Sequence, residues 1–277
     1  MALAEVHFFS NSVGLTMAMN VLLPDSGPGP FPVFYLLHGL SDDHTMWCRR
    51  TNIERYVSGM PLIVVMPETG RGWYTNSKSH PGRACEDMII KDVIPLVDRI
   101  FPTIKSRKGR VVGGLSMGGY GAMKLALKYP DLFCSATSHS GAVVGPLQIK
   151  DGVVKPKVDS PEFAAIFGPK LVGSDNDPVA LAKKCPKAKR PALRIDCGVD
   201  DFLIASNRSF HAKLTKMGYA HEYEEFPGSH TCVCSGNTHT CQPSGHTWAY
   251  WDLHVQDAIR FHCRQLGITL PSPFPAL

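Results

Sequence analysis

The sequence lacks a long hydrophobic run, a strong excess of one charge and the composition of a disordered chain. Its strongest apolar stretches, residues 34–37 and 62–66, are far shorter than the roughly 18–20 residues that a membrane-spanning helix needs. Lysine plus arginine number 29 against 24 aspartate plus glutamate, and this formal charge of +5 is too small and too scattered for a nucleic-acid-binding surface. With 44% hydrophobic and 19% charged residues, the chain is expected to fold as a globular protein without membrane or nucleic-acid partners.

Two features of secreted proteins are also missing. Residues 1–11 do not show a basic patch followed by an apolar segment and a small-residue cleavage site, so they do not resemble a signal peptide. The nine cysteines are an odd number without the spacing of a disulfide framework, which is typical of reduced thiols. Both observations favour a cytoplasmic protein.

The order of apolar segments predicts an α/β fold. Two strand-like runs, 4–10 and 15–23, are separated by a short turn and predict an antiparallel hairpin at the N-terminus. Short apolar runs then alternate with helical patterns, which is typical of a mostly parallel sheet with helices on both faces. The runs expected to be strands of this sheet lie near 33–37, 62–66, 110–113, 133–138, 193–197 and 220–226.

Four helices are expected between and after these strands. Residues 86–100 have helical spacing, with a bend at Pro95, and a second helix follows Ser116 and ends before Pro130. A third is expected from about 203 to 217 with Gly218 as its cap, and the last from about 247 to 263. The length fits one large domain or two small ones. We predict a single domain over 1–277, with residues 145–191 as a cap-like excursion that could roof a site and 229–244 as a Cys/His-rich insertion.

A nucleophile elbow is predicted at Ser116. Residues 114–118 read Gly-Leu-Ser-Met-Gly and stand between a strand and a helix. This turn needs small flanking residues where the backbone is crowded, and the helix N-terminus then faces a developing oxyanion. The order of partners in this kind of site is serine, aspartate, histidine, each after a strand. The backbone amides of Met117 and of Leu40, which follows Gly39, are the expected oxyanion donors.

The aspartate and histidine partners have several candidates. Asp200 and Asp201 both follow the strand near 193–197; Asp201 is preferred because it directly precedes a helix, although either could be a helix N-cap. His230, His239 and His246 stand in three similar units near the C-terminus. His246 is preferred because it alone leads directly into an apolar helix that can hold its loop in place.

The Cys/His-rich insertion also raises the question of a metal site. The possible soft ligands within it are His230, Cys232, Cys234, His239 and Cys241. Structural zinc sites usually use Cys-x(2–4)-Cys spacing, and Cys-x-Cys is tighter than that. A surface insertion with free thiols, or with a disulfide between Cys234 and Cys241, is therefore preferred, and no metal is predicted.

The sequence resembles the esterase D-like family of α/β-hydrolases, which includes short-chain acyl esterases and S-formylglutathione hydrolases. The segments that carry the resemblance are Tyr-Leu-Leu-His-Gly-Leu at 35–40, Trp47, Asn-Ile-Glu-Arg-Tyr at 52–56, Met-Pro-Glu at 66–68, Gly-Trp-Tyr-Thr-Asn at 72–76, the elbow, Ser-His-Ser-Gly at 138–141, Ile-Phe-Gly at 166–168, Asn-Asp-Pro at 176–178, Gly-Val-Asp-Asp-Phe-Leu at 198–203 and Gly-His-Thr-Trp-Ala-Tyr-Trp at 245–251. One departure is local: family members usually pass straight from the last strand to the catalytic histidine, whereas here residues 229–244 intervene and put His230 at the expected place.

The resemblance implies an α/β-hydrolase fold and a set of site residues. These are Ser116 as nucleophile, Asp201 as carboxylate, His246 as base, Leu40 and Met117 at the oxyanion hole, and His38, Gly39, Trp47, Trp73 and Tyr74 as substrate-binding residues, although such aromatics are more often plain core.

The predicted function is a serine carboxylesterase that hydrolyses short-chain acyl esters without a cofactor, and a homo-oligomer is compatible with the sequence. The nearest alternative is a thioesterase acting on S-formylglutathione. A feruloyl or acetyl esterase and an acyltransferase are further alternatives. A non-catalytic binding module that keeps the fold is the alternative from a different class.

Overall fold

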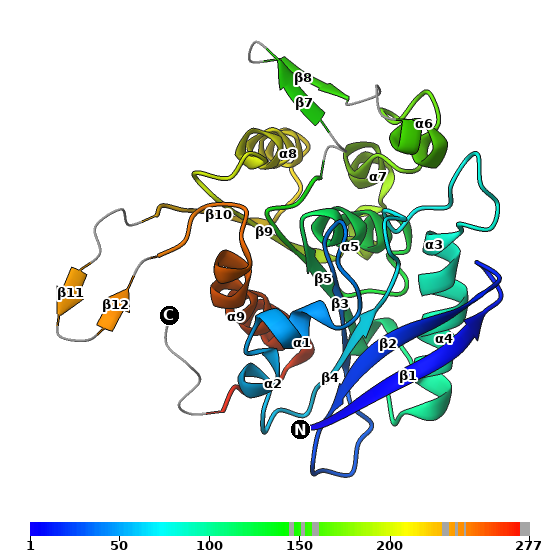
Figure 1. The fold of residues 1–277 in the computed structure, drawn as a ribbon, viewed down its shortest axis with the longest axis vertical. Helices are drawn as coiled ribbons and strands as arrows, with labels where there is room; N and C mark the ends of the chain where they lie inside the picture. The colour runs from blue at the N-terminus through cyan, green and yellow to red at the C-terminus, as the bar shows by residue number, and fades with distance from the viewer. Residues whose placement is uncertain are drawn as a thin grey trace.

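The computed structural model describes residues 1–143, 161–228 and 242–271, together with the backbone of strands at 147–150, 153–156, 233–235 and 238–240. An eight-stranded sheet runs through its centre in the order β1-β2-β4-β3-β5-β6-β9-β10 (Figure 1). β1 and β2 form an antiparallel hairpin, β2 pairs antiparallel with β4, and the remaining neighbours are parallel. The strands are β1 (Ala2–Ser10), β2 (Leu15–Leu23), β3 (Val33–Leu37), β4 (Ile63–Pro67), β5 (Arg110–Leu115), β6 (Ser135–His139), β9 (Ala192–Gly198) and β10 (Glu222–Phe226).

Helices cover both faces of this sheet (Figure 1). The central strands are buried along their whole length, because side chains on each face pack against a separate hydrophobic cluster. The cluster on one face includes residues of α4 (Ile94–Ile100), α5 (Met117–Lys128), α7 (Pro178–Lys184) and α8 (Ile204–Lys216). The cluster on the other face includes residues of α1 (Met46–Arg50), α2 (Ile53–Tyr56) and α9 (Trp248–Leu266). Within β3, Tyr35 belongs to the first cluster and Phe34 to the second.

The helical segment that was expected to bend at Pro95 changes helix type just before that residue. Instead of one regular helix, the chain forms α3 (Cys85–Asp87), a π-helix (Met88–Val93) and then α4. The N–H of Ile94 bonds to the carbonyl of Ile89, five residues back. Proline lacks the backbone N–H that would donate to the carbonyl four residues earlier in an α-helix. The wider π-helical turns just before Pro95 accommodate this missing hydrogen bond.

The described residues between β6 and β9 do not add a strand to the central sheet. They include a hairpin of β7 (Leu147–Lys150) and β8 (Val153–Pro156), then α6 (Pro161–Phe167) and α7 (Figure 1). A second small hairpin, β11 (Val233–Ser235) with β12 (Thr238–Thr240), lies within the insertion before α9. The described residues also form two 3-10 turns, Arg107–Gly109 and Lys187–Lys189. Among the helices described, none is both long and apolar enough to cross a membrane.

Candidate active site

Ser116 stands at a tight turn between β5 and α5. Its backbone has φ 53° and ψ −114°, a strained conformation for a residue with a side chain. The flanking glycines are required by close backbone contacts: a Cβ on Gly114 would lie 2.6 Å from the carbonyl oxygen of Leu37, and one on Gly118 would lie 2.4 Å from the same oxygen. The Gly-x-Ser-x-Gly pattern therefore reflects crowding at this turn, as a nucleophile elbow requires.

A chain of hydrogen bonds joins Ser116 to His246 and Asp201. The Oγ of Ser116 lies 3.0 Å from Nε2 of His246, and Nδ1 of the same ring lies 2.9 Å from Oδ2 of Asp201. Because an ionised carboxylate only accepts, Nδ1 donates to Asp201, which leaves Nε2 of the neutral ring to accept from the serine hydroxyl. The Asp201 side chain is fully buried, and its second oxygen accepts the N–H of Leu203 at 2.7 Å.

His246 is held in place by the start of α9. Thr247 caps that helix by accepting the N–H of Tyr250. The imidazole packs edge-on against Trp251, with ring centres 4.9 Å apart, and against Phe202 on the opposite loop, at 4.5 Å. The rivals His230 and His239 lie outside the residues whose side chains the structure describes.

The two neighbouring aspartates have different partners. Asp201 contacts the imidazole, whereas Asp200 accepts a hydrogen bond from Ser244, and the N–H of Asp200 donates to the carbonyl of Ser244 at 3.1 Å. Gly198 makes this approach possible, since a Cβ there would lie 1.9 Å from the Ser244 carbonyl oxygen. Asp200 therefore ties the loop that carries His246 to the end of β9. The sequence signal for this second anchor is only the adjacent Asp-Asp pair.

His38 lies under the loop that carries the predicted oxyanion donor Leu40. The ring is buried, with Nε2 accepting the N–H of Thr69 at 3.0 Å, so that Nδ1 carries the proton and donates to the carbonyl of Gly39 at 2.8 Å. Burial lowers the pKa of His38 to about 4, which keeps the ring neutral. The Gly39 carbonyl and the Leu40 N–H belong to one planar peptide, so fixing the carbonyl also fixes the direction of the amide.

The other predicted oxyanion donor, Met117, is the first residue of α5. An N–H at this position has no partner within the helix and lies at the positive end of the helix dipole.

Gly39 is fixed through its N–H as well as through its carbonyl. The N–H donates to a carboxylate oxygen of Asp42 at 3.1 Å.

A cleft of about 350 Å³ opens at Ser116. Its lining residues are Gly39, Leu40, Asp42, Leu115, Ser116, Phe202, His246, Thr247, Trp248 and Trp251. Asp42 is a partly buried carboxyl group in its wall, and burial raises its pKa despite the hydrogen bond from Gly39. The described residues of the predicted cap, 161–191, do not line this cleft.

Four of the five predicted substrate-binding side chains lie in the core instead of lining the cleft, and only Gly39 lines it. His38 supports the loop, as described above. Trp47 donates from Nε1 to the carbonyl of Leu37 and packs behind Trp248, and Tyr74 donates to the carbonyl of His38 at 3.0 Å. Trp73 packs among the rings of Tyr120, Phe163 and Phe167. Large aromatic side chains bury much apolar surface, which stabilises the core. Trp47, Trp73 and Tyr74 are buried in this way and do not line the cleft.

Sequence reasoning missed a buried polar cluster next to the elbow. The N–H of Ser116 donates to the carbonyl of His139 at 2.9 Å. Nδ1 of the His139 ring lies 2.9 Å from Asp196, whose carboxylate also accepts from the hydroxyl of Tyr250 at 2.9 Å. Burial opposes ionisation of Asp196, but His139, His254 and Arg194 together outweigh it and lower the pKa of this carboxyl group. The signal available in the sequence was the Ser-His-Ser-Gly segment at 138–141.

In the part of the chain that the structure describes, no group of three or more His, Cys, Asp or Glu side chains is placed to hold a metal ion. The candidates His230, Cys232, Cys234, His239 and Cys241 have side chains outside that part. The question of a metal or a disulfide in the insertion is therefore still a sequence-based prediction.

Comparisons with known proteins assign the family. A family model described as "Putative esterase" matches residues 10–262. An esterase of Mycobacterium tuberculosis is 32% identical over 250 residues, covering 80% of this chain and 54% of that protein, so the chain spans about half the length of this relative. An acetyl esterase of Caldicellulosiruptor saccharolyticus is 25% identical, covering 94% of this chain and 98% of the relative.

Two solved structures from Staphylococcus aureus are similar over nearly the whole chain. A fluorophosphonate-binding serine hydrolase with substrate bound has a TM-score of 0.76 and 31% identity, covering 94% of this chain and 97% of the other. An S-formylglutathione hydrolase has a TM-score of 0.75 and 30% identity, covering 94% and 98%. These similarities confirm the predicted α/β-hydrolase fold. Together with the family match over residues 10–262, they show that this chain belongs to the esterase family.

Proposed function

We propose that this chain is a serine carboxylesterase that hydrolyses short acyl esters through an acyl-enzyme. The observation that carries the proposal is the unbroken chain of hydrogen bonds from Ser116 through His246 to Asp201 beside an open cleft. A serine hydroxyl is a weak nucleophile until a base can take its proton, and the base needs a carboxylate to orient it. This arrangement supplies both.

The reaction follows from the roles of these groups. The Oγ of Ser116 attacks the ester carbonyl carbon while its proton passes to Nε2 of His246, and Asp201 stabilises the imidazolium that forms. The N–H groups of Leu40 and Met117 donate to the oxyanion. His246 then protonates the leaving alcohol, and a water molecule, activated by the same ring, attacks the acyl-enzyme and releases the acid. No step needs a cofactor, and the enzyme is proposed to act in the cytoplasm.

The cleft favours small, uncharged acyl groups. Its volume of about 350 Å³ is near the lower end of the roughly 300–1,000 Å³ typical of ligand pockets. Its walls are mostly apolar, from Leu40, Phe202, Trp248 and Trp251. Asp42 adds a carboxyl group to one wall, which disfavours an anionic acyl group when it is ionised.

The test is hydrolysis of p-nitrophenyl acetate and butyrate by Ser116→Ala. We expect a loss of more than about a thousandfold in kcat, because the nucleophile is removed. Ser58→Ala, which changes an exposed serine outside the cleft, is the matched control and should retain full activity. A fluorophosphonate probe should label the wild-type protein at Ser116. Full activity of the alanine variant would refute the proposal, and failure of labelling would favour a non-catalytic binding module.

A thioesterase that acts on S-formylglutathione is the second candidate, and the similarity to the S. aureus S-formylglutathione hydrolase supports it. It uses the same catalytic groups, so the two differ only in the substrate that the cleft accepts. Comparing kcat/KM for S-formylglutathione and for p-nitrophenyl acetate distinguishes them. Feruloyl or acetyl esters as substrates, and capture of the acyl group by an added alcohol, test the remaining alternatives.

A further inference from the structure

β1 forms an outer edge of the central sheet. It pairs with β2 on one side, and on its other side no strand of the described part of the chain pairs with it. An unpaired edge of nine residues offers free backbone groups to a further strand. The opposite edge, β10, is different: three of its five residues are Glu222, Glu224 and Glu225. Self-pairing centred on that strand would place Glu224 opposite its own copy, and like charges directly opposite are destabilising.

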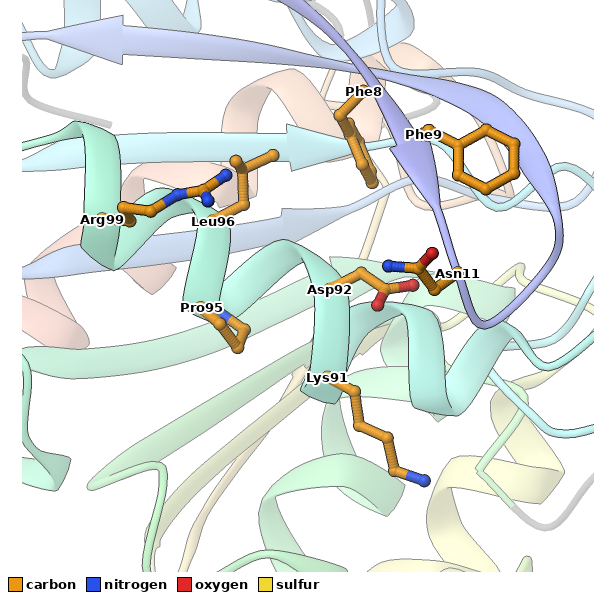
Figure 2. Close-up of a pocket in the computed structure, with 8 residues that line it drawn as sticks. All are labelled: Phe8, Phe9, Asn11, Lys91, Asp92, Pro95, Leu96 and Arg99. Atoms are coloured by element: carbon orange, nitrogen blue, oxygen red, sulfur yellow. The ribbon is translucent and has the colours of Figure 1, made fainter.

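β1 is held firmly in place as an edge. At its end, the carboxylate of Asp92 accepts from the hydroxyl of Ser10 at 2.5 Å and from the N–H of Ser12 at 3.0 Å. Phe8 packs on the hydrophobic cluster that also contacts Leu96 of α4. Figure 2 shows Phe8, Asp92 and Leu96 where the hairpin crosses the helical segment. The strand is therefore ordered before any partner binds, which reduces the entropy lost on association.

The polar side chains of β1 are complementary in one antiparallel register. A pairing of two copies that overlaps all nine residues has its two-fold axis at Val6, the middle of the strand. This register places Glu5 opposite His7 of the second copy, and it does so twice because of the symmetry. Within one copy the His7 ring lies 3.2 Å from the Glu5 carboxylate, which also lies 3.4 Å from His44, and the side chains of Glu5 and His7 are still exposed, at 55% and 63%. A pairing centred on Glu5 would instead place Glu5 opposite its own copy, and a pairing centred on His7 would place His7 opposite its own copy.

The apolar side chains of β1 match in the same register. Leu3 and Phe9 are exposed, at 49% and 63%, and they lie on the same face of the strand as Glu5 and His7 because side chains alternate. With Val6 at the axis, Leu3 of one copy faces Phe9 of the other at both ends of the ladder. Apolar cross-strand pairs of this kind stabilise a sheet.

We propose that two copies of this chain associate by antiparallel pairing of their β1 strands about Val6, which joins two eight-stranded sheets into one continuous sheet. The proposal does not rest on the proposed esterase activity. The β1 residues lie outside the cleft at Ser116, so variants in β1 are expected to keep the activity of the wild-type protein.

The experiment is sedimentation equilibrium of the full chain over a range of concentrations, with charge variants on β1. Wild-type protein is expected to be a dimer. His7→Glu places Glu5 opposite a second glutamate, and Glu5→Lys places a lysine opposite His7. Each variant is expected to raise the dimer Kd by about tenfold or more, because both Glu5–His7 cross-strand pairs are lost and an unfavourable pair takes the place of each. Mixing the two variants should restore a dimer, because the only complementary pairing is then between one copy of each.

Lys216→Glu, an exposed charge change on α8, is the matched control and should leave the dimer Kd unchanged. Hydrolysis of a p-nitrophenyl ester checks that each variant is folded, independently of its state of association; if no protein shows activity, a circular dichroism melt serves the same purpose. A monomeric wild-type protein overturns the proposal. It is also overturned by a dimer that neither single variant weakens, or by two weakened variants that do not associate on mixing.

Discussion

Replacing His38 by alanine is expected to reduce turnover although the side chain does not line the cleft. The ring fixes the Gly39–Leu40 peptide through the 2.8 Å bond from Nδ1 to the Gly39 carbonyl. A lost oxyanion donor typically reduces kcat by about 10²–10³. In His38→Ala the Leu40 N–H is still present but no longer held in direction, so we expect a smaller decrease, about 10-fold to 100-fold in kcat. KM should change less, since transition-state stabilisation is what is lost.

The same substitution should also destabilise the fold. It leaves the N–H of Thr69 buried without its acceptor, which costs about 1–3 kcal/mol, and it leaves a cavity. We expect a loss of about 2–4 kcal/mol in the free energy of unfolding, measured by urea titration.

His262→Ala provides the control for this loss of stability. His262 is equally buried, and it is hydrogen-bonded to the hydroxyls of Ser135 and Thr137 at 2.8 and 3.1 Å, but it does not contact the loop at Leu40. We expect a comparable loss of stability with wild-type kcat in the folded protein. The reasoning is refuted if His38→Ala keeps wild-type kcat, or if His262→Ala loses as much kcat as His38→Ala does.

Three further predictions concern the aspartate pair, the elbow and pH. Asp201→Asn should lower kcat for p-nitrophenyl acetate by about 10⁴, because the His246 ring loses its orienting carboxylate. Asp200→Asn loosens only the loop that carries His246 and should lower kcat by about tenfold. Equal effects of the two variants would contradict the assignment of Asp201 as the orienting carboxylate. Gly118→Ala should destabilise the protein by about 1–3 kcal/mol in urea and lower activity, because its Cβ would meet the Leu37 carbonyl at 2.4 Å. The pKa of His38 is lowered by burial from 6.5 to about 4, so the unfolded chain binds more protons between these values. Stability should therefore fall as pH decreases from about 6.5 to 4, and this part of the slope should be absent in His38→Ala; an unchanged slope in urea titrations would contradict it.

The main elements of the fold could be predicted because their sequence signals are local. The strand predicted at 33–37 has the same bounds in the structure as β3, and the helix predicted to end before Gly218 does so, with that glycine at φ 62°. Continuous apolar runs of strand length indicate burial on both faces. The π-helix before Pro95 was not predicted. The sequence shows that a regular α-helix is interrupted at the proline, but it does not show which hydrogen-bonding pattern the backbone adopts there.

The candidate site was predictable in part. Ser116 stands in a pattern that steric crowding imposes, so its position could be deduced from neighbouring residues. The choice of Asp201 over Asp200 rested only on proximity to a helix, and both aspartates proved to have a structural partner. The aromatic residues Trp47 and Trp73 could not be assigned to cleft or core, because a strand or loop pattern does not show which side chains a distant helix covers.

The sequence by itself determined the succession of strands and helices along the chain and the tight turn at Ser116, because each depends on residues close together in the chain. Only the tertiary structure decided which aspartate meets His246, which aromatics support the cleft from behind and that His38 orients the Leu40 peptide. These contacts join residues far apart in sequence, such as Ser116 and His246 at 3.0 Å. Their geometry is fixed by packing of the whole sheet and its helices, which no local pattern contains.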